Sequence, residues 1–171
     1  ELTQESQTFA LQDISEEPVL SVNREFSAPV HINFEQTDSD LFLLMTKDPD
    51  SFNRWESGQK LYRQTLLKFY SDLQGRQKPV LTDELSNSLL KTIKKGEDSP
   101  ALTAKLLELP QSHFLGQFIE DINPAHLHQA YLEFYTQMST KVHEQALAVY
   151  TNLAERNLGQ SAKDAELRAF K

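Results

Sequence analysis

The stretch FNRWESGQKLYRQTLLKFYSDL, residues 52–73, carries the clearest structural pattern in the sequence. Its apolar side chains recur at intervals of three and four residues, which places them on one wide face of an α-helix. They are Phe52, Trp55, Leu61, Tyr62, Leu66, Phe69, Tyr70 and Leu73. Asp50 or Ser51 can cap the start of this helix, and Gly75 follows its end. The stretch therefore predicts a long amphipathic helix and a mainly α fold.

Further helices are predicted on both sides of this one, because capping residues and prolines divide the rest of the chain after Gln36. The starts are Asp38 or Ser39 before DLFLLMTK, Thr82 before DELSNSLLKTIKK, Ser99 with Pro100 for a helix closed by Pro110, Ser112 before HFLGQFIEDI, and Asn123 with Pro124. The last predicted segment, of about 33 residues, is one helix or two with a kink near Ser139. Short connections favour antiparallel neighbours. The prediction is an irregular array of antiparallel helix pairs, an α–α superhelix without a strict repeat.

The apolar period is different in residues 8–34, where apolar residues come in short clusters separated by turn-forming stretches. The clusters are Phe9 with Leu11; Val19, Leu20 and Val22; and Val30, Ile32 and Phe34, with His31 and Asn33 on the opposite face of the last one. This pattern predicts two or three β-strands. So few strands cannot close a barrel or form a sandwich by themselves, so they are expected to be the end of a larger structure.

Composition excludes several classes of function. The chain has 171 residues and a net charge of −8, which would repel nucleic acid and anionic lipid, so neither is an expected partner. It contains no cysteine, which removes disulfides and thiolate chemistry and fits a reducing compartment. The N-terminal stretch ELTQESQTF lacks the basic and apolar regions of a signal peptide, so the expected location is cytoplasmic. The absence of an initiator Met suggests an internal piece of a longer protein.

The stretch HEQAL, residues 143–147, matches only the first two residues of a zinc-protease motif. The HExxH pattern needs its second histidine one turn after His143, and that position is Leu147. His126 and His128 lie two residues apart on a helix and cannot chelate one ion. The remaining histidines, His31 and His113, have no visible partner.

Charged clusters are explained without a ligand. The acidic pairs Glu16–Glu17 and Glu120–Asp121 are typical of solvated surface charge. Lys91, Lys94 and Lys95 lie near a helix C-terminus, where positive charge is favourable. No phosphate-binding loop or nucleophile elbow is present. The sequence therefore predicts no catalytic, cofactor-binding or metal-binding residue in the chain.

The Arg54–Trp55 pair lies where the extended segment meets the helices. Trp55 falls in the first turn of the long helix and is expected to be a largely buried anchor. Arg54 points away from the apolar face, where it can bond backbone carbonyls or a carboxylate such as Asp48 or Asp50. The pair is interpreted as a structural joint, with a binding role for either side chain as the alternative.

Several stretches, in order and spacing, resemble one enzyme family: TQESQTFALQDI, PVLSVNREFSAPVHINF, DLFLLMTKDPDSFNRWESGQKLYRQTL, SPALTAKLLELPQ and INPAHL. The chain is similar to the proteobacterial aminopeptidase N branch of the gluzincin zinc metallopeptidases. The resemblance covers about residues 1–157, with FSAPV and FNRW as its most specific elements, and the register after Leu158 is open.

This resemblance implies a domain organisation and a function. Residues 1–36 would be the terminal strands of a β-sandwich domain, and residues 37–171 the first part of an α-helical C-terminal domain that covers the active-site cavity. In the family, the HExxH motif, the GxMEN segment and the catalytic Tyr all precede the matched region. The parent would be a zinc enzyme that removes N-terminal amino acids from peptides, whereas this segment alone would carry no zinc and be inactive.

Partners follow from the same resemblance: peptide substrates for the parent only, and the catalytic domain of the same chain. The exposed strands also predict that residues 8–34 either take part in self-association or fold down against the helices. The alternative function is an independent helical-repeat scaffold that binds a peptide or protein partner on a concave face.

Overall fold

The computed structural model describes residues 5–10, 12–30, 32–156 and 158–171. Seven α-helices dominate the described residues, and three short 3-10 turns accompany them. The helices are α1 (Asp38–Lys47), α2 (Ser51–Gln74), α3 (Asp83–Lys94), α4 (Pro100–Leu107), α5 (Ser112–Leu115), α6 (Pro124–Glu155) and α7 (Ala162–Phe170). The 3-10 turns are η1 (Arg24–Phe26), η2 (Gly96–Asp98) and η3 (Gly116–Phe118). The mainly α prediction is confirmed.

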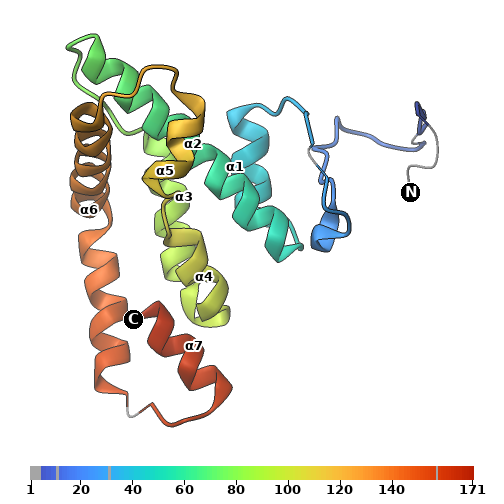
Figure 1. Ribbon diagram of the computed structural model, residues 1–171. Coiled ribbons are helices and arrows are strands. Elements are labelled where there is room, and N and C mark those ends of the chain that lie inside the picture. Colours follow the sequence, from blue (N-terminus) through green and yellow to red (C-terminus); the bar gives the residue numbers. More distant parts are fainter. Residues whose placement is uncertain (1–4, 11, 31, 157) are drawn as a thin grey trace.

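The core forms where α2 meets α1, α4 and α6, and α3 closes it by packing on α6 and α1 (Figure 1). The apolar face predicted for residues 52–73 supplies the centre, since Leu66 and Phe69 are fully buried. Phe134 of α6 packs on this face, with its ring centroid 5.9 Å from Tyr62 and 6.3 Å from Phe69. The helical periodicity of one segment thus explains the centre of the core.

Most predicted caps are present. The side chains of Asp50, Thr82 and Asn123 accept hydrogen bonds from the first backbone N–H groups of α2, α3 and α6. The cap of α1 is one residue earlier than expected, because Thr37 forms a reciprocal capping box with Asp40. Ser99 precedes α4 without a side-chain capping bond.

Two predicted helices are shorter than expected. The helix that begins at Pro100 ends at Leu107 and does not reach Pro110. The segment HFLGQFIEDI gives only α5, of four residues, followed by η3. Gly116 lies at the junction of α5 and η3, and glycine is a poor residue for continuing a helix.

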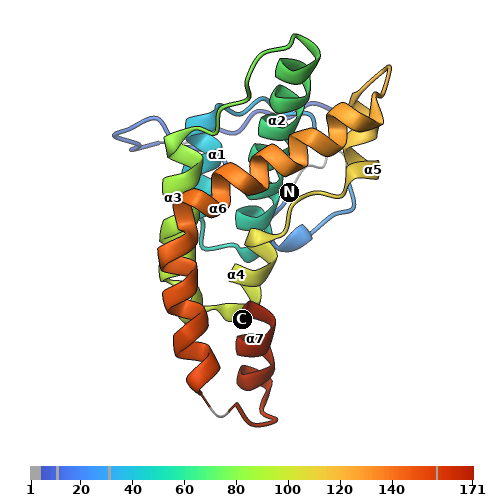
Figure 2. The same cartoon turned by 90° about the vertical axis from the view of Figure 1, so that its left-hand side faces the viewer.

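The long helix α6 is continuous over 32 residues, so the one-helix alternative is confirmed. Figure 2 shows that α6 changes direction near its middle. At that place the hydroxyl groups of Ser139 and Thr140 both donate to the carbonyl oxygen of Thr136, at 3.0 and 2.9 Å. Hydroxyl bonds of this kind to the preceding turn often bend helices.

Two tyrosines, the buried Tyr62 and the partly buried Tyr131, connect α2 and α6 to the chain around α4 and α5. The Tyr62 hydroxyl donates to the carbonyl of Leu106, and burial raises the pKa of Tyr62 well above its usual value. The Tyr131 hydroxyl donates to the carbonyl of Pro110, and burial raises the pKa of Tyr131 to about 12. These bonds hold the segment between α4 and α6 against the two longest helices.

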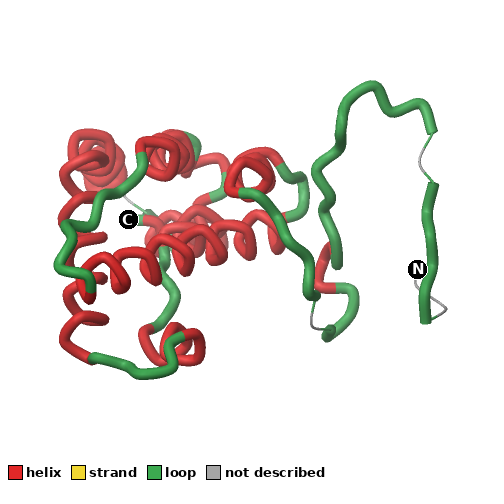
Figure 3. The backbone as a smooth tube through the Cα atoms, turned by 90° about the horizontal axis from the view of Figure 1, so that it is seen from above, coloured by secondary structure: helices red, strands yellow, loops and turns green. Residues whose placement is uncertain are grey.

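The N-terminal region differs from its prediction. No strand is present in residues 5–10, 12–30 and 32–36, where two or three were expected, and Figure 3 shows the region as a loop extending from the helices. A strand is stable only when a neighbour satisfies its backbone N–H and C=O groups, and no partner sheet is available here. Leu11 and His31, assigned to this pattern, lie outside the described residues. Phe9 and Val30 are 58% and 55% exposed.

Candidate functional site

A joint between the N-terminal segment and the helices is formed around the buried Asp50. Its Oδ1 accepts the backbone N–H of Asn53 at 2.7 Å, which caps α2. Its Oδ2 accepts the backbone N–H of Glu25 at 2.8 Å. Asp48, also buried, accepts the N–H of Asp50 at 2.8 Å, and Arg24 lies 3.9 Å from Asp48. One carboxylate therefore caps a helix and holds the preceding segment against it.

The turn held by Asp50 has an unusual backbone. Asn23, Glu25 and Phe26 have φ angles of 51°, 57° and 50°, in the left-handed region that non-glycine residues rarely adopt. The Asn23 side chain stabilises this turn by accepting the N–H of Ala28 at 2.9 Å and donating to its carbonyl at 3.0 Å. The ring of Phe26 lies 5.1 Å from that of Phe52. The turn thus precedes a described segment whose end, at Gln36, contacts Lys60 of α2.

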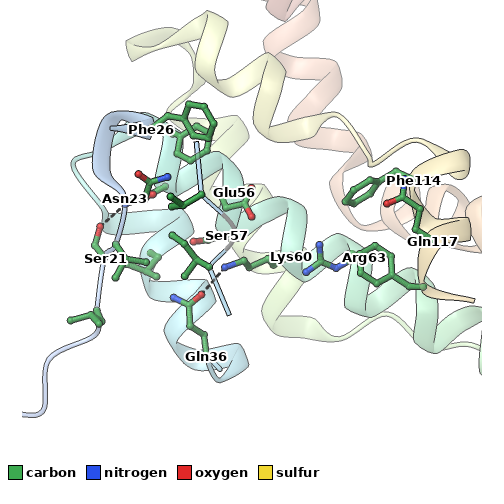
Figure 4. A pocket seen from close by; sticks show the side chains of 18 residues that line it. Ser21, Asn23, Phe26, Gln36, Glu56, Ser57, Lys60, Arg63, Phe114 and Gln117 are labelled. Carbon is green, nitrogen blue, oxygen red and sulfur yellow. Dashed lines mark hydrogen bonds between the residues drawn. The ribbon is translucent and has the colours of Figure 1, made fainter. Parts of the chain in front are cut away.

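A cavity of about 470 Å³ lies between residues 20–36, α2 and the segment 114–118 (Figure 4). Its volume is within the range of small-ligand sites, and its walls mix apolar with charged groups. The lining residues are Leu20, Ser21, Val22, Asn23, Phe26, Val30, Ile32, Gln36, Leu44, Phe52, Asn53, Glu56, Ser57, Lys60, Arg63, Phe114, Gln117 and Phe118. This cavity is the candidate functional site.

Charged side chains enter the cavity from α2. Lys60 Nζ donates to Gln36 Oε1 at 3.0 Å and ties the returning segment to the helix. The Arg63 guanidinium lies 4.8 Å from the centre of the Phe118 ring, in cation–π contact. Glu56 lies one turn before Lys60 and is half-buried, as is Arg63. The sequence analysis missed these residues, although the spacing 56, 60 and 63 along one helix is visible in the sequence.

A second hollow, of about 330 Å³, adjoins the first and shares Glu56, Arg63 and Phe114 with it. Trp55 lines this hollow and is partly buried, with its ring 5.9 Å from that of Phe52. It packs against the core, as the predicted anchor role requires. The indole packs on the core with one side and faces the hollow with the other.

Arg54 has the structural role predicted for it. Its Nε donates to the carbonyl oxygen of Met45 at 3.1 Å, in the last turn of α1. A cation at a helix C-terminus satisfies a free carbonyl and favourably opposes the helix dipole. Arg54 therefore joins α1 to α2.

The described histidines do not converge. His143 lines an apolar hollow with Leu147 and Tyr150, at the far end of α6. The His126 ring packs edge-on against Tyr70, and its Nδ1 is buried without a hydrogen-bond partner. In the part of the chain that the structure describes, no three His, Asp or Glu side chains are grouped so that they could hold a metal ion. Within the same described residues, no helix combines the length and apolar character that a membrane span requires.

Comparison with known proteins assigns most of the chain. Residues 38–171 match the family described as "Domain of unknown function (DUF3458_C) ARM repeats". Residues 1–35 match "Domain of unknown function (DUF3458) Ig-like fold". The helical part is thus of the class built from stacked helical repeats.

The chain belongs to the DUF3458_C family, and its predicted resemblance to aminopeptidase N is confirmed. It is 36% identical to Caulobacter vibrioides aminopeptidase N over 129 residues, which are 75% of this chain and 15% of that protein. It is 26% identical to Escherichia coli aminopeptidase N over 149 residues, which are 87% of this chain and 17% of that protein. The chain thus spans less than a fifth of the length of these two relatives.

A solved structure supports the same fold. The crystal structure of Legionella pneumophila aminopeptidase A in complex with aspartic acid matches with a TM-score of 0.71 and 20% identity. The match covers 87% of this chain and 18% of that chain. At this identity the likeness concerns the fold alone.

Proposed function

We propose that the chain is a non-catalytic segment of a zinc aminopeptidase and forms part of the helical cap over its active-site cavity. The observation that carries the proposal is the match to proteins named aminopeptidase N, which reaches 87% of the chain in the E. coli relative. An independent scaffold that binds a peptide or protein is the alternative, and no such protein is among the matches described above. The parent enzyme would remove N-terminal amino acids from peptides.

The proposed division of labour places the metal outside this segment. Zinc in such an enzyme polarises the scissile carbonyl and activates water. A catalytic zinc site needs three protein ligands, and the described residues offer no such group. This chain would instead contribute walls, through α2 and the segment between α4 and α6. The cytoplasmic location expected in the sequence analysis is part of the same proposal, and the absence of cysteine fits a reducing compartment.

The proposed domain boundary lies at residue 36. Residues 1–36 would be the end of a β-sandwich domain and residues 37–171 the first part of the helical domain. The separate matches of residues 1–35 and 38–171 support this division. The Asp50 joint supports it too, because it fastens the end of one part to the first helices of the other.

A chimera of the C. vibrioides enzyme tests the proposal. Its matched segment is replaced by this chain, and hydrolysis of an aminoacyl anilide is measured. The chimera should bind zinc and retain kcat/KM within about tenfold of the parent, because only the cap has been exchanged. A variant lacking the segment should cleave unfolded casein more readily, relative to short peptides, than the parent does, because the proposed cap would no longer restrict access. The isolated chain is the control and should neither bind zinc nor hydrolyse the anilide.

A chimera that folds and binds zinc but hydrolyses nothing would contradict the proposal. Should the chimera fail to fold, the remaining part of the C. vibrioides enzyme is expressed separately and mixed with this chain. Association of the two pieces is expected, and its absence would favour the independent scaffold.

The exposed N-terminal segment supports a second element of the proposal, which is self-association of the isolated chain through residues 8–34. Phe9, Val30 and Ile32 are exposed and apolar, and the matching Ig-like family implies a sheet partner that this structure lacks. Apolar surface and unpaired backbone of this kind favour association. In a longer protein the same surface would be covered within the chain.

Sedimentation velocity checks this expectation. The double variant Phe9→Asp/Val30→Asp should remain monomeric at concentrations where the unmodified chain associates, since charge is introduced into the contact surface. Val80→Asp is the matched control, because Val80 is 65% exposed and lies outside residues 8–34. Equal association of all three proteins would place the contact on the helices.

A further inference from the structure

Two opposite charges in the cavity wall have no counter-ion among the described residues. Glu56 makes no hydrogen bond or ion pair within the described part of the chain, and the contact described for Arg63 is with the face of Phe118. Both side chains are half-buried in the same cavity (Figure 4). A half-buried charge is more stable when it is paired, so the cavity offers one anionic and one cationic contact to a ligand.

The spacing of the two charges sets the size of that ligand. Glu56 and Arg63 are seven residues apart on α2, which is roughly two turns and about 10 Å along the helix axis. At this separation the two residues lie on one face of the helix, two turns apart. Residues that form ion pairs on a helix are usually three or four positions apart, so Glu56 and Arg63 are not expected to pair with each other. Lys60 lies between them and is engaged by Gln36 at 3.0 Å. The ligand therefore needs a positive and a negative end about 10 Å apart.

We infer that the cavity binds a short peptide in its zwitterionic form, with the terminal ammonium at Glu56 and the terminal carboxylate at Arg63. An extended chain spans about 3.3 to 3.6 Å per residue, so a tripeptide fits the distance between the two charges. The inference does not depend on the proposed function, because it stands on the cavity of this chain alone. It adds a peptide-binding site within the helical segment.

The arrangement of each end suits its partner. Stacking on Phe118 holds the planar Arg63 fork in place, and such a fork matches the geometry of a carboxylate. Lys60 lies one turn from Arg63 and raises the positive potential at that end. Phe52, Phe114 and Val30 provide apolar wall for the side chains of the peptide. The two charges determine the direction in which the peptide binds, and the apolar wall can accept different peptide side chains.

Blocked peptides test both ends separately. Binding of trialanine, N-acetyl-trialanine and trialanine amide to the full 171-residue chain is measured by NMR titration. Trialanine should bind with a millimolar Kd, and each blocked peptide should bind about tenfold more weakly, because each lacks one charge-assisted contact. Dialanine should also bind more weakly, because it is too short to reach both groups.

Substitutions of Glu56 and Arg63 test which residue binds which end of the peptide. Glu56→Gln should abolish the discrimination against N-acetyl-trialanine while keeping the discrimination against the amide, and Arg63→Gln should do the reverse. Glu144→Gln, on the exposed surface of α6, is the matched control and should bind all three peptides like the unmodified chain. Circular dichroism checks that each variant is folded.

Three outcomes would overturn the inference. They are equal binding of blocked and free peptides, unchanged binding in both variants, and absence of trialanine binding at millimolar concentration. If a variant does not fold, the blocked peptides on the unmodified chain decide alone. An active chimera with no peptide binding would refute this site and leave the proposed function standing, so the two failures are distinguishable.

Discussion

Replacing Phe134 by alanine is expected to lower the free energy of unfolding by about 3 to 5 kcal/mol. Phe134 is 2% exposed and lies where α6 crosses α2, with its ring edge-on to Tyr62 at 5.9 Å. The substitution removes the transfer free energy of the ring and leaves a cavity between two helices that cannot close fully. Because the core forms where α2 meets α6, a large loss of stability is expected from this single truncation.

Denaturant unfolding followed by circular dichroism measures the effect. Tyr135→Ala is the matched control, since Tyr135 is the neighbouring aromatic on the same helix and is 55% exposed. It should cost about 1 kcal/mol or less. Equal losses for Phe134→Ala and Tyr135→Ala would show that the crossing of α2 and α6 is not the centre of the core.

Replacing Gly96 by alanine is expected to release α7 from the rest of the protein. A Cβ atom at Gly96 would lie 2.1 Å from Cζ of Phe170 and within 2.8 Å of two further ring atoms. Such an overlap costs about 1 to 3 kcal/mol, and the ring must move. The other contacts that hold α7 are its packing against α4, the buried Leu167 and the Lys171 ammonium 5.5 Å from the Tyr150 ring, so the release is expected to begin at the Phe170 end.

Limited trypsin digestion measures this release. Cleavage at Lys163 and Arg168 should be faster in Gly96→Ala, while the thermal unfolding of the remaining helices changes little. Gly75→Ala is the control, because its nearest contact would be an ordinary 3.5 Å to the Ser71 carbonyl oxygen. Adding Phe170→Ala to Gly96→Ala should change cleavage less than the two single effects predict, because the clash is then absent. Unchanged cleavage in Gly96→Ala would show that the ring does not hold α7.

Local sequence patterns predicted most helices for a physical reason. Caps and periodic apolar faces act over one to four residues, so Asp50, Thr82 and Asn123 could be assigned from their immediate neighbours. The role of Arg54 was also accessible, because the carbonyl of Met45 lies only nine residues away along the chain. The early end of the helix from Pro100 and the short α5 were not predicted.

The N-terminal strands show the limit of such patterns. The alternation of Val30, Ile32 and Phe34 predicts which face of a strand would be apolar. A strand forms, however, only when other parts of the chain provide hydrogen-bond partners for its backbone. The helix α7 was missed although its start carries a local signal, the capping box of Ser161 and Asp164. Its packing through Phe170 on Gly96 joins residues 74 positions apart, and neither this contact nor the strand pairing is encoded in a local window.

The sequence by itself determined the mainly α class, the position of the long helix at residues 52–73, most helix starts and the resemblance to aminopeptidase N. Only the tertiary structure decided the candidate site. The spacing of Glu56 and Arg63 on one helix face is visible in the sequence. Phe118, Gln36 and Val30 line the same cavity only because the Asp50 joint and the Tyr131 hydrogen bond hold their segments near α2. These contacts join residues far apart in the chain, and their geometry depends on packing, which no local pattern specifies.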